Sequence, residues 1–179
     1  MIIESTVRPK PQNSNAKIAF LVSMLLFLLT LATYMTLEKY RGVVALVSIC
    51  FLTSAILFFT KFLASVMYYD IKLDSEGIPI FVVRQQTGKR MVTLARIEIA
   101  DIEEIISESR EERKKHKTPA GVLKYNYGPT LNPKNTLRLI HKSRYENSEI
   151  IIEATEEYAN ALREYSVIAK TLRAESGDE

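Results

Sequence analysis

Two long apolar segments dominate the pattern of hydrophobic and polar positions in the first third of the chain. Ile18–Leu37 is a run of twenty residues without a charged side chain, and Gly42–Thr60 is a second run of nineteen. At about 1.5 Å of rise per helical residue, each run is roughly 30 Å long, which matches the hydrocarbon thickness of a bilayer. The corner between them, Glu38–Arg41, is short enough to join only neighbouring antiparallel helices. The pattern therefore predicts a two-helix transmembrane hairpin over residues 17–69.

A second pattern begins at Asp70, where apolar and polar residues alternate over short segments separated by turns. Alternation with a period of two is typical of half-buried strands, and Gly77 and Gly88 are suited to the turns between them. Residues 102–107 also permit a short helix, and the charged residues 108–117 are expected to form a loop or exposed strand ends. The predicted strands cover residues 69–73, 78–84, 90–95, 102–107, 122–127, 137–141 and 150–153.

The chain finishes with a predicted amphipathic helix. Thr155 is a suitable N-cap, Glu156 and Glu157 place negative charge in the first turn, and Lys170 and Arg173 place positive charge near the end. Apolar side chains recur at three- and four-residue spacing, and this face is expected to cover the sheet; a docking surface for a partner or for lipid is the alternative. The apolar face consists of Tyr158, Ala161, Leu162, Tyr165, Ile168, Ala169 and Leu172.

These patterns divide the chain into four parts. Residues 1–16 are expected to be a flexible lead, because they contain two prolines and no apolar stripe. The hairpin occupies residues 17–69. Residues 70–173 form one small domain, since the roughly 110 residues that follow the hairpin are enough for a core of their own. Residues 174–179 are a polar tail.

The net charge of +3 is distributed unevenly. Residues 1–41 carry a net charge of +3 and Lys61 adds one, whereas residues 70–179 carry eighteen basic and nineteen acidic residues. A balanced domain argues against a nucleic-acid partner, for which a clustered basic surface is expected. More Lys and Arg flank the side of the hairpin that bears the two termini, so a multi-pass protein of the cell membrane with both termini in the cytoplasm is predicted. A cleaved signal peptide fits less well, because the first apolar run exceeds the usual core of about 7–15 residues.

The sequence contains few groups for catalytic or metal chemistry. Cys50, the only cysteine, lies within the second apolar run and has no partner for an intramolecular disulfide. His116 and His141 have no second histidine or cysteine at metal-ligand spacing, and phosphate-loop, nucleophile-elbow and HExxH motifs are missing from the sequence. The adjacent carboxylates Glu103-Glu104 and Glu111-Glu112 are expected to be solvated. We therefore expect no cofactor, no metal and no enzyme activity.

Five cations are candidates for contact with lipid headgroups. Lys61 follows nineteen uncharged residues, so it is expected to mark the end of the membrane and to extend its ammonium group toward the headgroups. A buried cation in a pathway or against a partner is the alternative for Lys61. The other four candidates lie in the charge run and are Arg113, Lys114, Lys115 and Lys117.

Seven short strands and a closing helix after a two-span hairpin resemble the bacterial pleckstrin-homology-like (PH-like) membrane proteins. The resemblance covers about residues 18–173 and rests on Tyr69–Leu73, the Gly77-Ile78 turn, Ala100–Glu103 and Ile150–Glu153. It implies a membrane α-helical hairpin plus an α+β domain, in which a PH-like antiparallel sheet barrel or sandwich of about seven strands is capped by the C-terminal helix. The first turn, Asp74–Glu76, is acidic where phosphoinositide-binding members carry basic residues, which argues against inositol-phosphate binding at that turn.

Two classes of function follow from this layout. The first is a non-enzymatic membrane protein whose cytosolic PH-like domain binds another protein, or a lipid headgroup, as a scaffold or accessory factor. The second is an oligomeric transport or channel subunit, or an assembly factor for a membrane complex; the layout of two spans and a small domain is also similar to photosystem assembly factors, by architecture alone. The expected partners are the lipid bilayer, a protein, and, in an oligomer, further copies of the chain.

Overall fold

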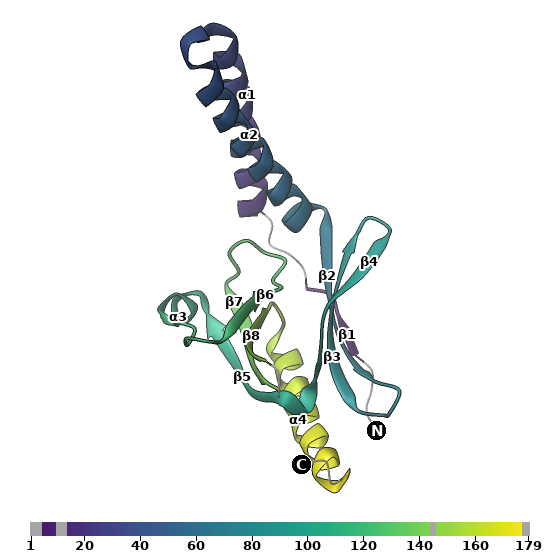
Figure 1. Ribbon diagram of the computed structural model, residues 1–179. Coiled ribbons are helices and arrows are strands. Elements are labelled where there is room, and N and C mark those ends of the chain that lie inside the picture. The colour runs from purple at the N-terminus through teal and green to yellow at the C-terminus, as the bar shows by residue number, and fades with distance from the viewer. Residues whose placement is uncertain (1–4, 10–13, 144–145, 177–179) are drawn as a thin grey trace. The chain divides into compact units, whose positions relative to one another are not determined.

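The chain forms two units (Figure 1). Pro11–Ser65 makes up one unit, and Met1–Lys10 together with Val66–Glu179 makes up the other. The computed structural model describes residues 5–9, 14–143 and 146–176. The expected lead (residues 1–16) and tail (residues 174–179) therefore lie partly outside the described residues.

The first unit is a pair of adjacent helices. Two segments are long and apolar enough to cross a membrane, Asn15–Thr36 and Glu38–Leu63, as the apolar runs predicted. Phe20 and Phe59 bring their rings to 5.8 Å between centroids, while Ser23 and Ser48 are buried small residues of the kind that let helices approach closely. The elements are α1 (Ser14–Thr36), the 3₁₀ turn η1 (Glu38–Tyr40), α2 (Arg41–Phe58) and the π-helical turn η2 (Phe59–Leu63).

The first sheet of the second unit has the strand order β1-β2-β3-β4. Its strands are β1 (Ser5–Val7), β2 (Ser65–Leu73), β3 (Pro79–Thr87) and β4 (Arg90–Glu98). β1 differs from the expected flexible lead: it pairs antiparallel with β2, and the Thr6 hydroxyl donates to Asp70 Oδ1 at 2.8 Å. Three residues are too few to show a periodicity, and the pairing exists because β2 offers backbone groups along its edge.

The second sheet has the strand order β5-β7-β8-β6. The expectation of a fully antiparallel arrangement is wrong for β6, which pairs parallel with β8. β6 and β7 lie on opposite edges of β8, because residues 127–134 carry the chain from one edge to the other. Residues 102–107 are a strand, and the loop expected over residues 108–117 contains a helix, α3. The elements are η3 (Ile99–Asp101), β5 (Ile102–Ser109), α3 (Arg110–Lys115), β6 (Leu123–Asn126), β7 (Asn135–Lys142) and β8 (Asn147–Ile152).

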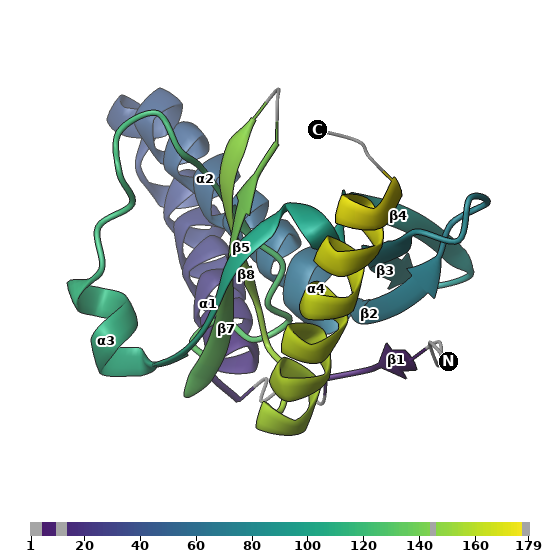
Figure 2. The ribbon, with the colours of Figure 1, turned by 90° about the horizontal axis from the view of Figure 1, so that it is seen from below.

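All seven predicted strands are present, and in the described residues they form, with β1, two four-stranded sheets rather than one closed sheet. The two sheets and the C-terminal helix α4 (Glu156–Ser176) enclose one core (Figure 2). α4 begins where predicted: the Thr155 hydroxyl accepts from the backbone N–H of Tyr158 at 3.4 Å. Fully buried core side chains include Tyr69, Ile71, Phe81, Ile102, Leu139, Ile150, Ile152 and Leu162.

Candidate functional site

α3 is a short helix whose start is fixed by a capping box. The Ser109 hydroxyl accepts from the backbone N–H of Glu112 at 3.4 Å, and Glu112 Oε2 accepts from the backbone N–H of Ser109 at 2.8 Å. These hydrogen bonds, the one from the Ser109 backbone first, lower the pKa of Glu112. The Ser-x-x-Glu spacing was the available sequence signal for this helix. The charge run concealed it, because α3 has no apolar face.

Arg113 holds α3 against the second sheet. Its Nη1 donates to the hydroxyl of Thr136 at 3.1 Å, and its Nη2 donates to the backbone carbonyl of Pro133 at 2.9 Å. Both acceptors belong to the start of β7 and the turn before it. Arg113 was a predicted headgroup contact, and the structure instead gives its guanidinium two partners within the domain.

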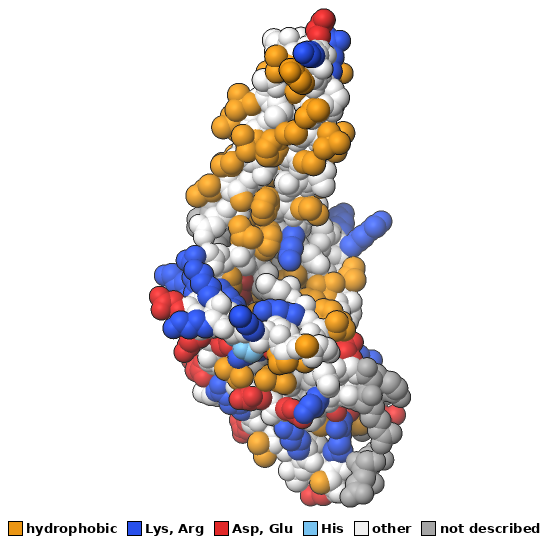
Figure 3. Space-filling view, turned by 60° about the vertical axis from the view of Figure 1, so that its left-hand side comes forward, with side chains coloured by type: hydrophobic (Ala, Val, Ile, Leu, Met, Phe, Trp, Pro, Cys, Tyr) orange, Lys and Arg blue, Asp and Glu red, His pale blue; other side chains and the backbone are white. Residues whose placement is uncertain are grey.

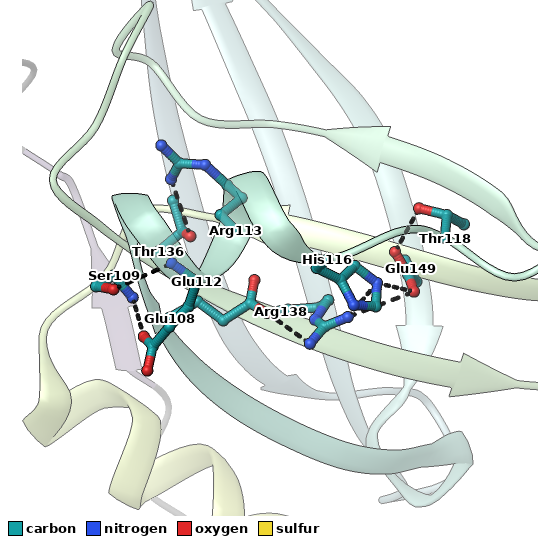
Figure 4. Close-up of polar contacts among 9 residues, drawn as sticks. All are labelled: Glu108, Ser109, Glu112, Arg113, His116, Thr118, Thr136, Arg138 and Glu149. Atoms are coloured by element: carbon teal, nitrogen blue, oxygen red, sulfur yellow. Dashed lines mark hydrogen bonds and ion pairs between the residues drawn. The ribbon is translucent and has the colours of Figure 1, made fainter.

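A buried cluster of charged side chains lies next to α3 on the outer face of the second sheet (Figure 4). The strand register brings it together, because β5 and β8 flank β7 and place Glu108, Arg138 and Glu149 on the face opposite the core. Arg138 Nη2 is 2.5 Å from Glu108 Oε1, and Arg138 Nη1 is 3.6 Å from Glu149 Oε1. All three residues are at most 7% exposed. One arginine is therefore shared by two buried carboxylates.

Residues that follow α3 complete this cluster. His116 Nε2 is 2.8 Å from Glu149 Oε1, and the Thr118 hydroxyl donates to Glu149 Oε2 at 2.9 Å. His116 Nε2 also contacts Arg138 Nη1. Because arginine has no acceptor, these two contacts compete: the ring nitrogen accepts from Arg138 when it is unprotonated and donates to Glu149 when it is protonated.

Glu149 is ionised in this setting. Its burial opposes ionisation, but the hydrogen bonds from His116 and Thr118 and the charges of His116 and Arg138 outweigh the burial and lower the pKa of Glu149. The cluster is not fully satisfied, since Glu108 Oε2 and Arg138 Nε have no hydrogen-bond partner among the described residues. Its effect is structural: it holds the segment after α3 on the sheet through charge-assisted contacts.

α3 and the residues that follow it also present exposed cations. Arg110, Lys114, Lys115 and Lys117, called the basic face below, are exposed and form no ion pair with any described carboxylate. Figure 3 shows Lys and Arg side chains gathered on the side where α3 lies. Lys61 belongs to η2 in the other unit, where its Nζ lies 5.3 Å from the ring centroid of Phe62. Three of the five predicted headgroup contacts, Lys114, Lys115 and Lys117, therefore belong to the basic face. Arg113 is bound to Thr136 and Pro133 within the domain, and Lys61 belongs to the other unit.

A recess of about 390 Å³ also lies on this unit. His141 lines it, with Nδ1 3.2 Å from Ser148 Oγ and Nε2 3.9 Å from Asp101 Oδ2. Arg173 of α4 already binds the carboxylate of Asp101 at 2.7 Å and that of Glu98 at 2.5 Å. The carboxylates of Asp101 and Glu98 in the recess are thus already paired with a cation of the same domain. Among the described residues, no group of three His, Cys, Asp or Glu side chains could hold a metal ion.

Comparison with known proteins adds no identification. No protein-family model matches the chain, and neither a curated protein nor a solved structure matches it. The resemblance to PH-like membrane proteins therefore stays a prediction from the sequence. The function has to be argued from the apolar helices, the basic face and the surfaces of the second unit.

Proposed function

We propose that this chain is an integral membrane protein whose hairpin holds a non-catalytic interaction domain at the membrane. The apolar side chains of the helices support the membrane part: Leu21, Leu25 and Ile49 are 62%, 57% and 63% exposed. Two adjacent helices with such surfaces would present water with an apolar area far above the few hundred Å² that soluble proteins tolerate. In a bilayer this apolar area contacts lipid chains instead of water.

The distribution of Lys and Arg supports a hairpin with both termini in the cytoplasm. Reporter fusions test this topology directly. A fusion after Glu179 is expected to report the cytoplasm, and an insertion within the corner Glu38–Arg41 is expected to report the outside. Two cytoplasmic readings would show that one of the helices does not cross.

The observation that carries the interaction part of the proposal is the basic face, which is presented by a helix with little freedom to move. The capping box and Arg113 fix the backbone of α3, so binding a partner orders few additional groups. The basic face has no apolar side chain to insert into a bilayer. It therefore fits an acidic segment of a partner protein, which it would bind by long-range, salt-sensitive attraction.

The proposal is tested with the full chain in nanodiscs and a fluorescent glutamate-rich peptide as the probe. Lys114→Glu with Lys115→Glu is expected to weaken binding by about tenfold or more, since each lost or reversed contact of this kind is worth on the order of 1 kcal/mol. The matched control is Lys124→Glu with Lys170→Glu, which makes the same change in net charge at exposed positions outside α3. Equal effects of the two double variants would refute a role for the basic face.

A second arm of the experiment separates protein from lipid. Wild-type affinity for the peptide is measured in nanodiscs of neutral lipid and in nanodiscs that contain anionic lipid. If the basic face serves an acidic protein, the neutral discs show binding that falls with added salt. The other outcome has two parts. The peptide binds in neither kind of nanodisc, and the double variant of α3 changes how strongly anionic nanodiscs protect the domain from hydrogen exchange. In that case the partner is the headgroup layer instead.

A further inference from the structure

The β3–β4 hairpin ends in a tip, residues 84–96, that combines exposed apolar side chains with positive charge alone. Met91, Val92 and Leu94 are 47%, 56% and 36% exposed. The same thirteen residues contain four cations and no acidic residue. Exposed apolar side chains that are grouped together and bordered by polar residues are typical of a surface that binds a partner or a membrane. The composition of this tip therefore calls for an explanation.

The tip is an ordered extension of the first sheet. Thr87 pairs with Arg90 across a two-residue turn in which Gly88 adopts a φ of 60°, a conformation that glycine takes at no steric cost. A β-bulge follows Val83, and beyond it the strands leave the core. Arg84 contacts the buried carboxylate of Asp70, so the base of the tip is fixed to β2. This leaves Lys89 and Arg90 as exposed cations at the end of the ribbon, without an ion pair among the described residues.

The covalent chain limits how far the strand that carries this tip can lie from the end of the apolar helices. The helical segment ends at Leu63 and β2 begins at Ser65. The Tyr68 hydroxyl donates to Gln86 Oε1 at 2.9 Å, which places the end of β3 beside the first half of β2. Tyr68 lies five positions after Leu63, and a fully extended chain covers at most about 3.6 Å per position, or roughly 18 Å in all. This limit follows from chain length alone.

We propose that the β3–β4 tip is a second membrane contact and that its ligand is an anionic lipid surface. Met91 and Val92 enter the interfacial layer, and Lys89 and Arg90 bind anionic headgroups. Amphipathic membrane-binding elements combine the same two kinds of contact. The proposal rests on the membrane-spanning hairpin of the proposed function. A second copy of the chain is a poorer occupant, because two such tips would bring cations against cations.

The test uses the full chain with Cys50→Ser, which removes the only cysteine, and single new cysteines labelled with an environment-sensitive fluorophore. Val92→Cys reports the tip. Glu76→Cys is the matched control, exposed in the turn at the other end of β2 and β3. Leu29→Cys, within α1, reports whether the helices are in the bilayer. Each protein is reconstituted into vesicles of phosphatidylcholine with or without phosphatidylglycerol, and quenching by nitroxide-labelled lipid is measured.

We expect the label at residue 92 to shift its emission to shorter wavelength and to be quenched in vesicles with phosphatidylglycerol, while the label at residue 76 is unaffected. Lys89→Gln with Arg90→Gln is expected to remove most of this quenching. Equal signals at residues 92 and 76, with residue 29 strongly quenched, would overturn the tip contact but keep the hairpin. An unquenched residue 29 would overturn the spanning hairpin itself. Blue-shifted emission at residue 92 that depends on protein concentration, without quenching by lipid, would assign the tip to a second copy and refute the proposal.

Discussion

The hydroxyl of Tyr69 donates to the backbone carbonyl of Tyr127, 2.9 Å away, and so joins the first sheet to the segment that follows β6 in the second. The same oxygen accepts from the backbone N–H of Glu153 at 3.3 Å. Tyr69 is fully buried, and this burial raises the pKa of its hydroxyl. One phenolic group thus satisfies two backbone groups of the opposite sheet, which makes it a specific link between the two layers.

Tyr69→Phe is expected to lower the free energy of unfolding by about 1–3 kcal/mol, because it leaves two buried backbone groups without a partner. The measurement is thermal unfolding of the full chain in detergent, followed by near-ultraviolet circular dichroism. Tyr158→Phe is the control: the Tyr158 hydroxyl is buried without a hydrogen-bond partner among the described residues, so its removal should be neutral or stabilising. Equal losses in the two variants would contradict the proposed link.

The packing of α4 gives a second prediction. Leu162 is fully buried and Glu164 is exposed, as their positions on the helix predicted, while Tyr165 is partly buried against the core. Leu162→Ala is expected to cost roughly 2–5 kcal/mol and to lower the melting temperature by many degrees, since an isolated domain has only about 5–15 kcal/mol in total.

Glu164→Ala serves as the surface control for this prediction and should leave the melting temperature almost unchanged. The opposite order would show that the apolar face of α4 is a docking surface rather than part of the core. In that case Leu162→Ala would leave unfolding unaltered and abolish an association instead.

Glu149 and Glu153 are expected to affect stability with opposite signs as the pH changes. The pKa of Glu149 lies below its ordinary value of 4.5, so its contribution is present above pH 4.5 and is lost as the pH falls through the lowered value. Burial raises the pKa of Glu153 against the hydrogen bond it accepts from Thr130, so its contribution is present below pH 4.5 and is lost as the pH rises through the raised value.

Melting temperatures of the wild type, Glu149→Gln and Glu153→Gln between pH 7 and pH 3 test this contrast. At pH 7 Glu149→Gln is expected to melt below the wild type, with a difference that shrinks toward acid pH. Glu153→Gln is expected to melt at or above the wild type at pH 7, because glutamine keeps an acceptor for the Thr130 N–H without a buried charge. The same sign of change for both variants at pH 7 would refute the assignment.

The helices and strands that depend on interactions between residues close together in the sequence could be predicted from the sequence. The two apolar helices, the seven strands and the start of α4 at Thr155 all depend on periodicities of 3.6 or two and on local capping. β1 could not be predicted in this way, because it needs the edge of β2 beside it. α3 has a local signal in the capping box of Ser109 and Glu112, but it has no apolar face, and the contacts of Arg113 that hold it are made with residues distant along the chain.

The sequence by itself determined where the apolar helices lie, which segments alternate as strands, and that positive charge without acidic residues is concentrated in residues 84–96. Only the tertiary structure decided which charges are buried. Glu108, Arg138 and Glu149 look like ordinary surface residues in the sequence, and they meet because β7 lies between β5 and β8. A charge is buried only where a partner of opposite sign reaches it, and strand register, which no local pattern encodes, determines which partners meet.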